Sequence, residues 1–371
     1  MADPRIQRWA ETLTRYCLYV QPGETVLIYA TPLAAPLVEA VYREVLRAGG
    51  HPLPRISLPA LNEIALKEAS DEQLAFVSPI DDVMAETVSA RLSIMSDENV
   101  SALASVDPAR QAVLQRAGVA ARRRYREREQ QGQFKWCGTL YPTQAYAQNA
   151  GMSLPDFTEF VYQACFLNDE RPAERWRELA AHQQRYVDWL KGKKRVRVLG
   201  RDTDLTLSIE GRTFINSDGK RNFPSGEFFT GPVEDSAEGT IRYTVPSAHN
   251  GRVVQDIRLR FHNGEVVEAT AAQGQDFMEQ MLKMDDGSRR LGEFAFGNNF
   301  GITRGISNTL FDEKIGGTIH LALGSSYPET GGLNQSALHW DMVCDLRPAA
   351  GGGEVWVDDT LFLKDGKLMV G

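Results

Sequence analysis

One stretch decides the fold of the first half of the chain: residues 25–58, TVLIYATPLAAPLVEAVYREVLRAGGHPLPRISL. It opens with a short, continuous apolar run, TVLIYA, which is typical of a buried strand. Residues 36–50 then carry apolar side chains at helical spacing and close on two glycines, which suit a helix C-terminus. PLPRISL follows as a second candidate strand. Strand, helix and strand in this order predict a βαβ unit with a parallel sheet.

The sequence on either side of this unit is mainly helical. Residues 5–20 show helical spacing and end before Pro22 and Gly23, which stop a helix. Residues 68–132 are rich in helix formers, with one candidate strand at RLSIMS (91–96). Residues 153–194 are again helical. The first half is therefore predicted to be an α/β domain.

After about residue 195 the pattern changes to short runs with period-two alternation, separated by Gly, Asn and Asp. FHNGEVV (261–267) places Asn-Gly between two such runs, which is the strongest short hairpin signal. A second hairpin is expected around Asp365-Gly366. The prediction is a two-domain α/β protein: an N-terminal α/β domain with a parallel sheet (1–190) and a mainly antiparallel, β-rich C-terminal domain (191–371).

Composition excludes several classes of function. The formal net charge is −8, whereas nucleic-acid binders usually carry a basic surplus. No run approaches the length of about 18 apolar residues that a membrane helix needs. The N-terminus has charges throughout and no apolar core, so no signal peptide is visible. The four cysteines form no CxxC pair. We expect a cytoplasmic protein in a reducing environment that binds neither nucleic acid nor membrane.

Two of the six histidines stand out by their context. In TIHLALG (318–324), a strand would point His320 to the face opposite its apolar neighbours, beside small residues. In LHWDMV, His339 and Asp341 are two residues apart, so on a strand they share a face. A lone histidine is more often a core residue than a ligand, but these nitrogen and oxygen donors together suit Zn²⁺, Mn²⁺, Co²⁺ or Fe²⁺.

Two glutamates complete a possible ligand set. Glu227 lies in NFPSGEFFTGP and Glu293 in RLGEFAFGNN, and both segments are apolar and rich in glycine. A carboxylate buried there without a partner would be costly, although each glutamate taken alone could equally be a surface acid in a loop. With His320, His339 and Asp341 they give five candidate ligands, enough for two metal ions if one carboxylate bridges.

The blocks around these residues are similar to a known family. PSGEFFTGPVEDSAEGTI, LGEFAFG, HLALGSSY and NQSALHWDM resemble those of the aminopeptidase T family, the thermophilic or leucyl-type metallo-aminopeptidases. PGETVLI and YPTQAYAQNAGMS in the first half are also similar, though less specific. The resemblance covers nearly the whole chain. It implies homodimers whose active sites open into an internal cavity.

The resemblance also implies roles for individual residues. The family's metal ligands fall on Glu227, Glu293, His320, His339 and Asp341, and its catalytic tyrosine falls on Tyr327. It implies that two divalent ions (Zn, Co or Mn) activate a bridging water against peptides with a free N-terminus. Glu293 is expected to bridge the ions, and Glu227 to combine ligation with proton transfer. The stretch between Tyr327 and His339 is shorter than in some members, which leaves substrate preference open.

Two rival functions stay open on sequence alone. His320, His339 and Asp341 form a two-histidine, one-carboxylate set of the kind that non-haem iron dioxygenases use. Such an iron site has no need of Glu227, Glu293 or Tyr327. The other rival is a non-catalytic peptide-binding protein on the same scaffold, against which a complete ligand set argues.

Overall fold

The computed structural model describes residues 3–249 and 251–370, which form two compact units. The first unit comprises the residues up to Ala173 together with Gly219–Phe223. The second comprises Glu174–Asp218 and the residues from Pro224 onwards. These compact units divide the chain differently from the domain boundary predicted near residue 190, which stays a prediction. Almost all of helix α10 belongs to the second unit, and the short segment Gly219–Phe223 belongs to the first.

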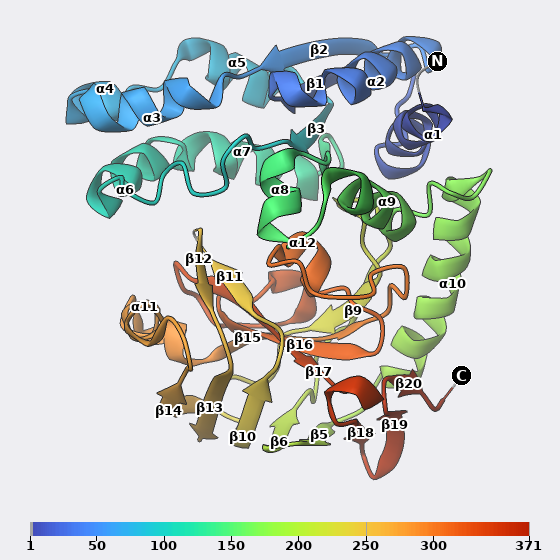
Figure 1. The fold of residues 1–371 in the computed structure, drawn as a ribbon, viewed down its shortest axis with the longest axis vertical. Helices are drawn as coiled ribbons and strands as arrows, with labels where there is room; N and C mark the ends of the chain where they lie inside the picture. Colours follow the sequence, from blue (N-terminus) through green and yellow to red (C-terminus); the bar gives the residue numbers. More distant parts are fainter. Residues whose placement is uncertain (1–2, 250, 371) are drawn as a thin grey trace. The chain divides into compact units, whose positions relative to one another are not determined.

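The first unit is built on a parallel five-stranded sheet with the strand order β2-β1-β3-β4-β8. Figure 1 labels its strands β1, β2 and β3. Its strands are β1 (Thr25–Ala30), β2 (His51–Ile56), β3 (Ala90–Met95), β4 (Lys135–Leu140) and β8 (Asn222–Phe223). Its helices are α1 (Pro4–Thr12), α2 (Ala35–Arg47), α3 (Pro59–Glu68), α4 (Asp71–Leu74), α5 (Pro79–Thr87), α6 (Pro108–Ala117), α7 (Val119–Gln130), α8 (Gln144–Asn149) and α9 (Leu154–Ala164).

The predicted βαβ unit is confirmed. Strand β1 is apolar on both faces, and Val26, Leu27 and Ile28 have no exposed surface (0%), as expected of a central parallel strand covered on both sides. Helix α2 begins beside Pro36 and ends at Arg47, and Gly49 follows with φ +82°. That left-handed conformation suits glycine, which lacks a Cβ.

The second unit pairs two antiparallel sheets. Its strands are β5 (Arg195–Gly200), β6 (Thr203–Ser208), β7 (Ile215–Ser217), β9 (Glu227–Thr230), β10 (Glu238–Tyr243), β11 (Ser247–His249), β12 (Arg252–Val254), β13 (Ile257–His262), β14 (Glu265–Thr270), β15 (Leu291–Gly297), β16 (Thr318–Gly324), β17 (His339–Asp345), β18 (Gly353–Val357), β19 (Thr360–Lys364) and β20 (Lys367–Leu368). Its helices are α10 (Pro172–Leu190), α11 (Gln275–Met281) and α12 (Thr309–Asp312).

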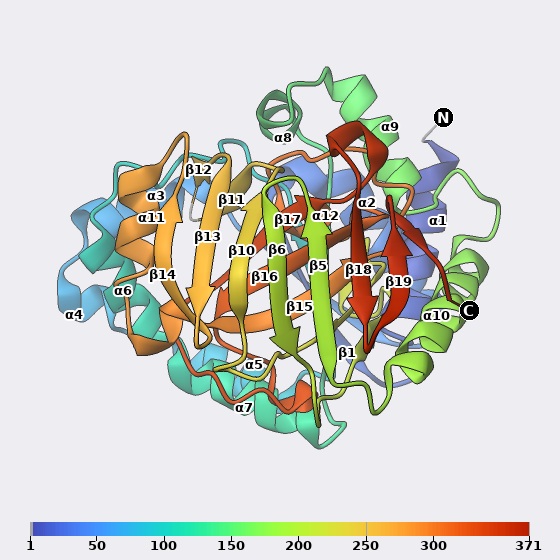
Figure 2. The same cartoon turned by 90° about the horizontal axis from the view of Figure 1, so that it is seen from below.

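The eight-stranded sheet has the order β14-β13-β10-β6-β5-β18-β19-β20, and the five-stranded sheet has the order β17-β16-β15-β9-β7. Figure 2 shows the larger sheet face-on, with β15, β16 and β17 crossing behind it. One apolar core lies between them, to which Val198 and Tyr243 contribute from the larger sheet and Phe294 and Leu321 from the smaller. The predicted α/β class, with a parallel sheet and then antiparallel sheets, is confirmed.

Both predicted hairpins are present. Strands β13 and β14 are joined at Asn263-Gly264, and β19 and β20 at Asp365-Gly366. All four turn residues have positive φ, between 49° and 76°, as a two-residue hairpin loop requires. None of the helices formed by the described residues has the length and apolar character needed to cross a bilayer.

Candidate metal centre

One face of the five-stranded sheet carries all five candidate ligands. Strand pairing sets Glu293 opposite Ala322, and Ala322 opposite Asp341. Residues directly opposite each other point to the same face, as do residues two apart on one strand. His320 and His339 therefore join this face, and Glu227 joins it by pairing with Gly297, four residues beyond Glu293.

The other face of the same strands is apolar and buried in the core. Phe294, Phe296, Ile319, Leu321 and Trp340 lie there, each at most 1% exposed. The alternation predicted for TIHLALG is confirmed, because His320 lies on one face of the sheet and Ile319 and Leu321 lie on the other. A rigid, packed face thus supports the polar one, which is the arrangement that holds ligands in fixed positions.

A β-bulge puts Glu293 on the polar face. Leu291 pairs with Leu323, but Glu293 pairs with Ala322, so the register shifts by one residue at Gly292. Simple alternation would leave Leu291 and Glu293 on the same face. The extra residue instead directs the leucine into the core and the carboxylate into the site.

Glycine is required at this bulge. A Cβ on Gly292 would lie 2.2 Å from the Gly324 carbonyl oxygen and 2.5 Å from that of Ser325. We expect Gly292→Ala to lower the free energy of unfolding by about 1–3 kcal/mol and to reduce bound metal, because Glu293 would shift with the strand. Gly138→Ala on β4 is the matched control, since its nearest heavy atom is 4.0 Å away. Equal chemical denaturation midpoints and equal metal content for the two variants would contradict this account.

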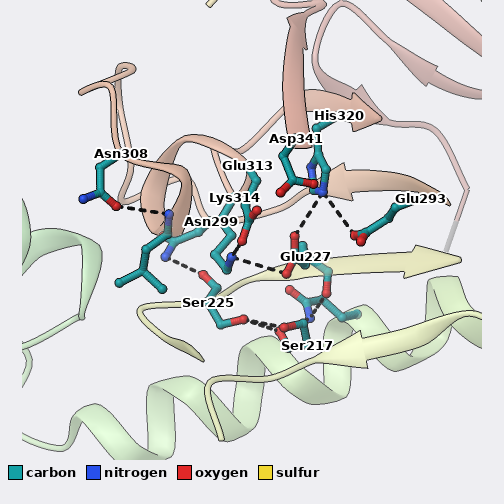
Figure 3. Close-up of polar contacts among 12 residues, drawn as sticks. Ser217, Ser225, Glu227, Glu293, Asn299, Asn308, Glu313, Lys314, His320 and Asp341 are labelled. Carbon is teal, nitrogen blue, oxygen red and sulfur yellow. Dashed lines mark hydrogen bonds and ion pairs between the residues drawn. The ribbon is translucent and has the colours of Figure 1, made fainter. Parts of the chain in front are cut away.

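The side chains converge closely, and Figure 3 shows four of them, those of Glu227, Glu293, His320 and Asp341. The two oxygens of Glu293 face different imidazoles: Oε1 lies 3.3 Å from His320 Nε2, and Oε2 lies 3.5 Å from His339 Nε2. Glu227 Oε2 lies 3.5 Å from His320 Nε2, and Asp341 Oδ1 lies 3.6 Å from His339 Nε2. Two groups of possible ligand atoms result, Glu227–Glu293–His320 and Glu293–His339–Asp341, each with its atoms within 4.8 Å of one another.

These residues fit divalent cations. Among the described residues, neither Glu227 Oε2 nor Asp341 Oδ1 has a hydrogen-bond partner, although both atoms are buried. A buried polar atom that is left without a hydrogen bond costs about 1–3 kcal/mol. The cluster holds more carboxylates than the protein's own cations neutralise, and it contains oxygen and nitrogen donors without thiolate. Such a donor set suits zinc, manganese or cobalt.

Charge shifts the protonation of the site residues. Burial lowers the pKa of His320, but its hydrogen bond to Glu293 and the charge of Glu227 outweigh burial and raise it overall. His339 behaves alike: burial lowers its pKa, and Asp341 and Glu293 raise it above the usual value. Burial raises the pKa of Glu293. Because a metal ion binds the deprotonated forms of these groups, metal binding at this site would compete with protons.

Two residues of the cluster escape sequence reasoning: Glu313 and Lys314, directly after α12. Glu313 forms a third group of possible ligands with His320 and Asp341. Lys314 has no exposed surface, and its Nζ lies 3.4 Å from Glu227 Oε1 and contacts Glu313 Oε1. The sequence did contain a signal for them. Glu313 and Lys314 are charged residues between the apolar Phe311 and Ile315, and they precede His320 by seven and six residues.

Tyr327 lies at the edge of this cluster and is 45% exposed. Its ring centroid is 5.3 Å from that of His339 and 5.3 Å from that of Phe229. Burial, and then the charges of Glu293 and Asp341, raise the pKa of its phenol. The phenol therefore keeps its proton at neutral pH and can act as a hydrogen-bond donor.

A separate hollow lies on the eight-stranded sheet, away from this cluster. It has a volume of about 760 Å³ and is lined by strands of the eight-stranded sheet. Charged side chains on that surface already pair with each other, as Arg197 does with Asp204 at 2.8 Å. The cluster of candidate ligands borders a small cavity of about 10 Å³ beside Glu313 and Asp341. We assign the chemistry to the cluster, because there buried carboxylate oxygens without a hydrogen-bond partner lie beside two imidazoles.

Buried carboxylates and imidazoles gathered on one rigid sheet face define a metalloenzyme. The family model of the thermophilic metalloproteases (M29) matches residues 2–367. The chain belongs to this family and is a metal-dependent peptidase, and the resemblance to the aminopeptidase T family is confirmed.

Relatives and a solved structure agree with this assignment. The chain is 29% identical to "Aminopeptidase 2" of Geobacillus stearothermophilus, across 98% of this chain and 95% of that protein. It is 27% identical to "Aminopeptidase T" of Thermus thermophilus, across 87% and 85%. The structure "Wild-type AmpT from Thermus thermophilus" shares the fold with a TM-score of 0.84 over 99% of both chains, at 24% identity.

Proposed function

We propose that the chain is an aminopeptidase whose active site holds two divalent metal ions bridged by Glu293. The observation that carries the proposal is the position of the two Glu293 oxygens, each facing a different imidazole at 3.3 and 3.5 Å. One carboxylate shared by two ligand groups is the arrangement that a two-metal site needs.

The other ligands divide between the two ions. Glu227 and His320 would hold one, and His339 and Asp341 the other. Glu313 is a further ligand candidate on the side of His320. Zinc, cobalt and manganese all suit this donor set, so the native ion is identified by elemental analysis of protein purified without added metal.

Two such ions would supply a bridging water of lowered pKa and polarise the scissile carbonyl. The protein's own residues do the rest. Glu227 has an oxygen without a hydrogen-bond partner, so it can combine ligation with proton transfer. Tyr327, protonated and partly exposed beside His339, would donate a hydrogen bond to the oxyanion of the tetrahedral intermediate.

We expect the substrate to be a peptide with a free α-amine. The relatives named above are aminopeptidases, and a carboxylate-rich site attracts the ammonium of a peptide N-terminus. We expect purified protein to hydrolyse aminoacyl chromogenic substrates, and their N-acetylated forms to resist cleavage. Chelation should abolish the activity, and Co²⁺, Zn²⁺ or Mn²⁺ should restore it. Full activity in protein shown by elemental analysis to be metal-free would refute the proposal.

An iron-dependent, ring-cleaving dioxygenase is the weaker alternative. Each of the three groups of possible ligands contains a glutamate, which an iron triad of two histidines and Asp341 does not need. Oxygen consumption with a dihydroxypyridine, without peptide hydrolysis under any metal, would favour it.

Assembly and location follow from the family expectation. We propose a homodimer located in the cytoplasm. Light scattering coupled to size-exclusion chromatography tests the dimer, and a monomer at assay concentration would refute it.

A further inference from the structure

Lys314 is a buried cation in the middle of the candidate metal centre. Its side chain is 0% exposed, whereas that of Lys283, for comparison, is 72% exposed. A buried ammonium is stable only when opposite charges pair with it. Two carboxylates do so here: Glu227, with its Oε1 at 3.4 Å from Nζ, and Glu313 (Figure 3).

The backbone fixes the position of this lysine. Its N–H donates to the Phe311 carbonyl at 3.0 Å, and its carbonyl accepts from Asn299 N at 3.0 Å. The preceding helix α12 is tied down by Asp312, whose carboxylate accepts from Ile306 N at 2.8 Å and from Asn308 N at 3.0 Å. Lys314 is therefore a built part of the site and not a mobile surface side chain.

Lys314 pairs with some carboxylates of the cluster and not with others. Its ion pairs reach Glu227, in the group with His320, and Glu313. Among the described residues, neither Glu293 nor Asp341 forms an ion pair with a lysine or arginine. Within the described part of the chain, the Glu293–His339–Asp341 group thus has no lysine or arginine paired with its carboxylates, whereas Glu227 is paired with Lys314.

We propose that Lys314 is an internal counter-ion that stabilises the metal-free site and weakens binding of the ion on the Glu227 side, which makes that ion the exchangeable one. This inference rests on the proposed two-metal function. Without metal, the ammonium offsets the repulsion among Glu227, Glu313 and their neighbours. With metal, the same ammonium repels a dication at short range in a buried setting, where Coulomb interactions are strong.

The effects of Lys314 on stability and on affinity are linked. A group that stabilises the metal-free state more than the loaded state must lower metal affinity by the same free energy. Lys314→Met should therefore lower the melting temperature in chelator more than in saturating Mn²⁺. It should also tighten the weaker of two Mn²⁺ binding steps by about tenfold or more, within the usual range of such coupling.

The test is a titration with Mn²⁺, in which the EPR signal of the free ion gives stoichiometry and affinity without any activity assay. Calorimetric melting in chelator and in Mn²⁺ accompanies it. Wild type should show two steps that differ in affinity. Lys283→Met, a change of the same chemistry at an exposed position, should match wild type in both measurements. In chelator, adding Glu313→Gln to Lys314→Met should recover part of the lost melting temperature, because it removes one of the unbalanced carboxylates.

Unchanged or weaker Mn²⁺ binding in Lys314→Met would overturn the inference. Unchanged binding would mean that Lys314 has no effect on metal affinity, and weaker binding would mean that it positions the ligands. If that variant is insoluble, Lys314→Gln keeps a hydrogen-bond donor without the charge. Folding of either variant only when Mn²⁺ is present supports the inference, whereas failure to fold even with Mn²⁺ overturns it. Absence of any metal binding in wild type is a separate outcome, which refutes the proposed function itself.

Discussion

Asp341→Ala should lose bound metal and catalytic activity together while the protein stays folded. Asp341 is 9% exposed, and its Oδ1 is buried without a hydrogen-bond partner, so its removal leaves the core intact and relieves charge repulsion in the metal-free state. Activity depends on the metals, whose contribution is several kcal/mol, so kcat/KM should fall on the order of 10³-fold or more. His339→Ala should behave in the same way.

The controls for this prediction are two exposed histidines outside the cluster. His182 lies on α10 beside Tyr186, and His51 begins the edge strand β2. Their alanine variants should keep wild-type metal content, measured by elemental analysis, and wild-type rates. If His182→Ala depletes metal as strongly as Asp341→Ala does, the ligand assignment is wrong. Melting temperatures separate a lost ligand from a lost fold.

Sequence predicted the parts of this site that depend on local alternation. His320 lies between apolar residues in a strand, and a period of two is enough to assign it to the polar face. His339 and Asp341 share a face for the same reason. In the first half, the βαβ unit was predictable because continuous apolar strands and glycine-closed helices are local features.

The parts that depend on tertiary structure were not predictable. The residues LGEFAFG alone do not predict the bulge at Gly292, which makes Leu291 and Glu293 point to opposite faces. The bulge depends on how this strand pairs with the neighbouring backbone at Gly324 and Ser325. Lys314 would ordinarily be taken for a solvated turn residue, and its burial follows from packing against distant strands. Strand β8, with two residues, has no pattern of its own, yet it pairs with β4.

The surroundings of Tyr327 are consistent with its proposed role as a hydrogen-bond donor in the transition state. Burial, and then the charges of Glu293 and Asp341, raise the pKa of its phenol, and its ring packs against His339 and Phe229. A donor held there has little to bind in the ground state, when the substrate carbonyl carries only a partial charge. The same donor becomes strong when an oxyanion forms, and this difference is what lowers a barrier.

Tyr327→Phe should therefore keep both metals and a near-normal KM, while kcat falls by about 10²–10³-fold. Tyr42→Phe on α2 is a suitable control, because that tyrosine is 40% exposed, close to the 45% of Tyr327, and lies in the other unit. Steady-state kinetics on an aminoacyl substrate, with metal content measured on the same samples, distinguish the roles. A fall in kcat without loss of metal assigns the phenol to the transition state, because a purely structural tyrosine would change metal content or stability first. An unchanged kcat would return Tyr327 to a packing role and leave oxyanion stabilisation to the metals alone.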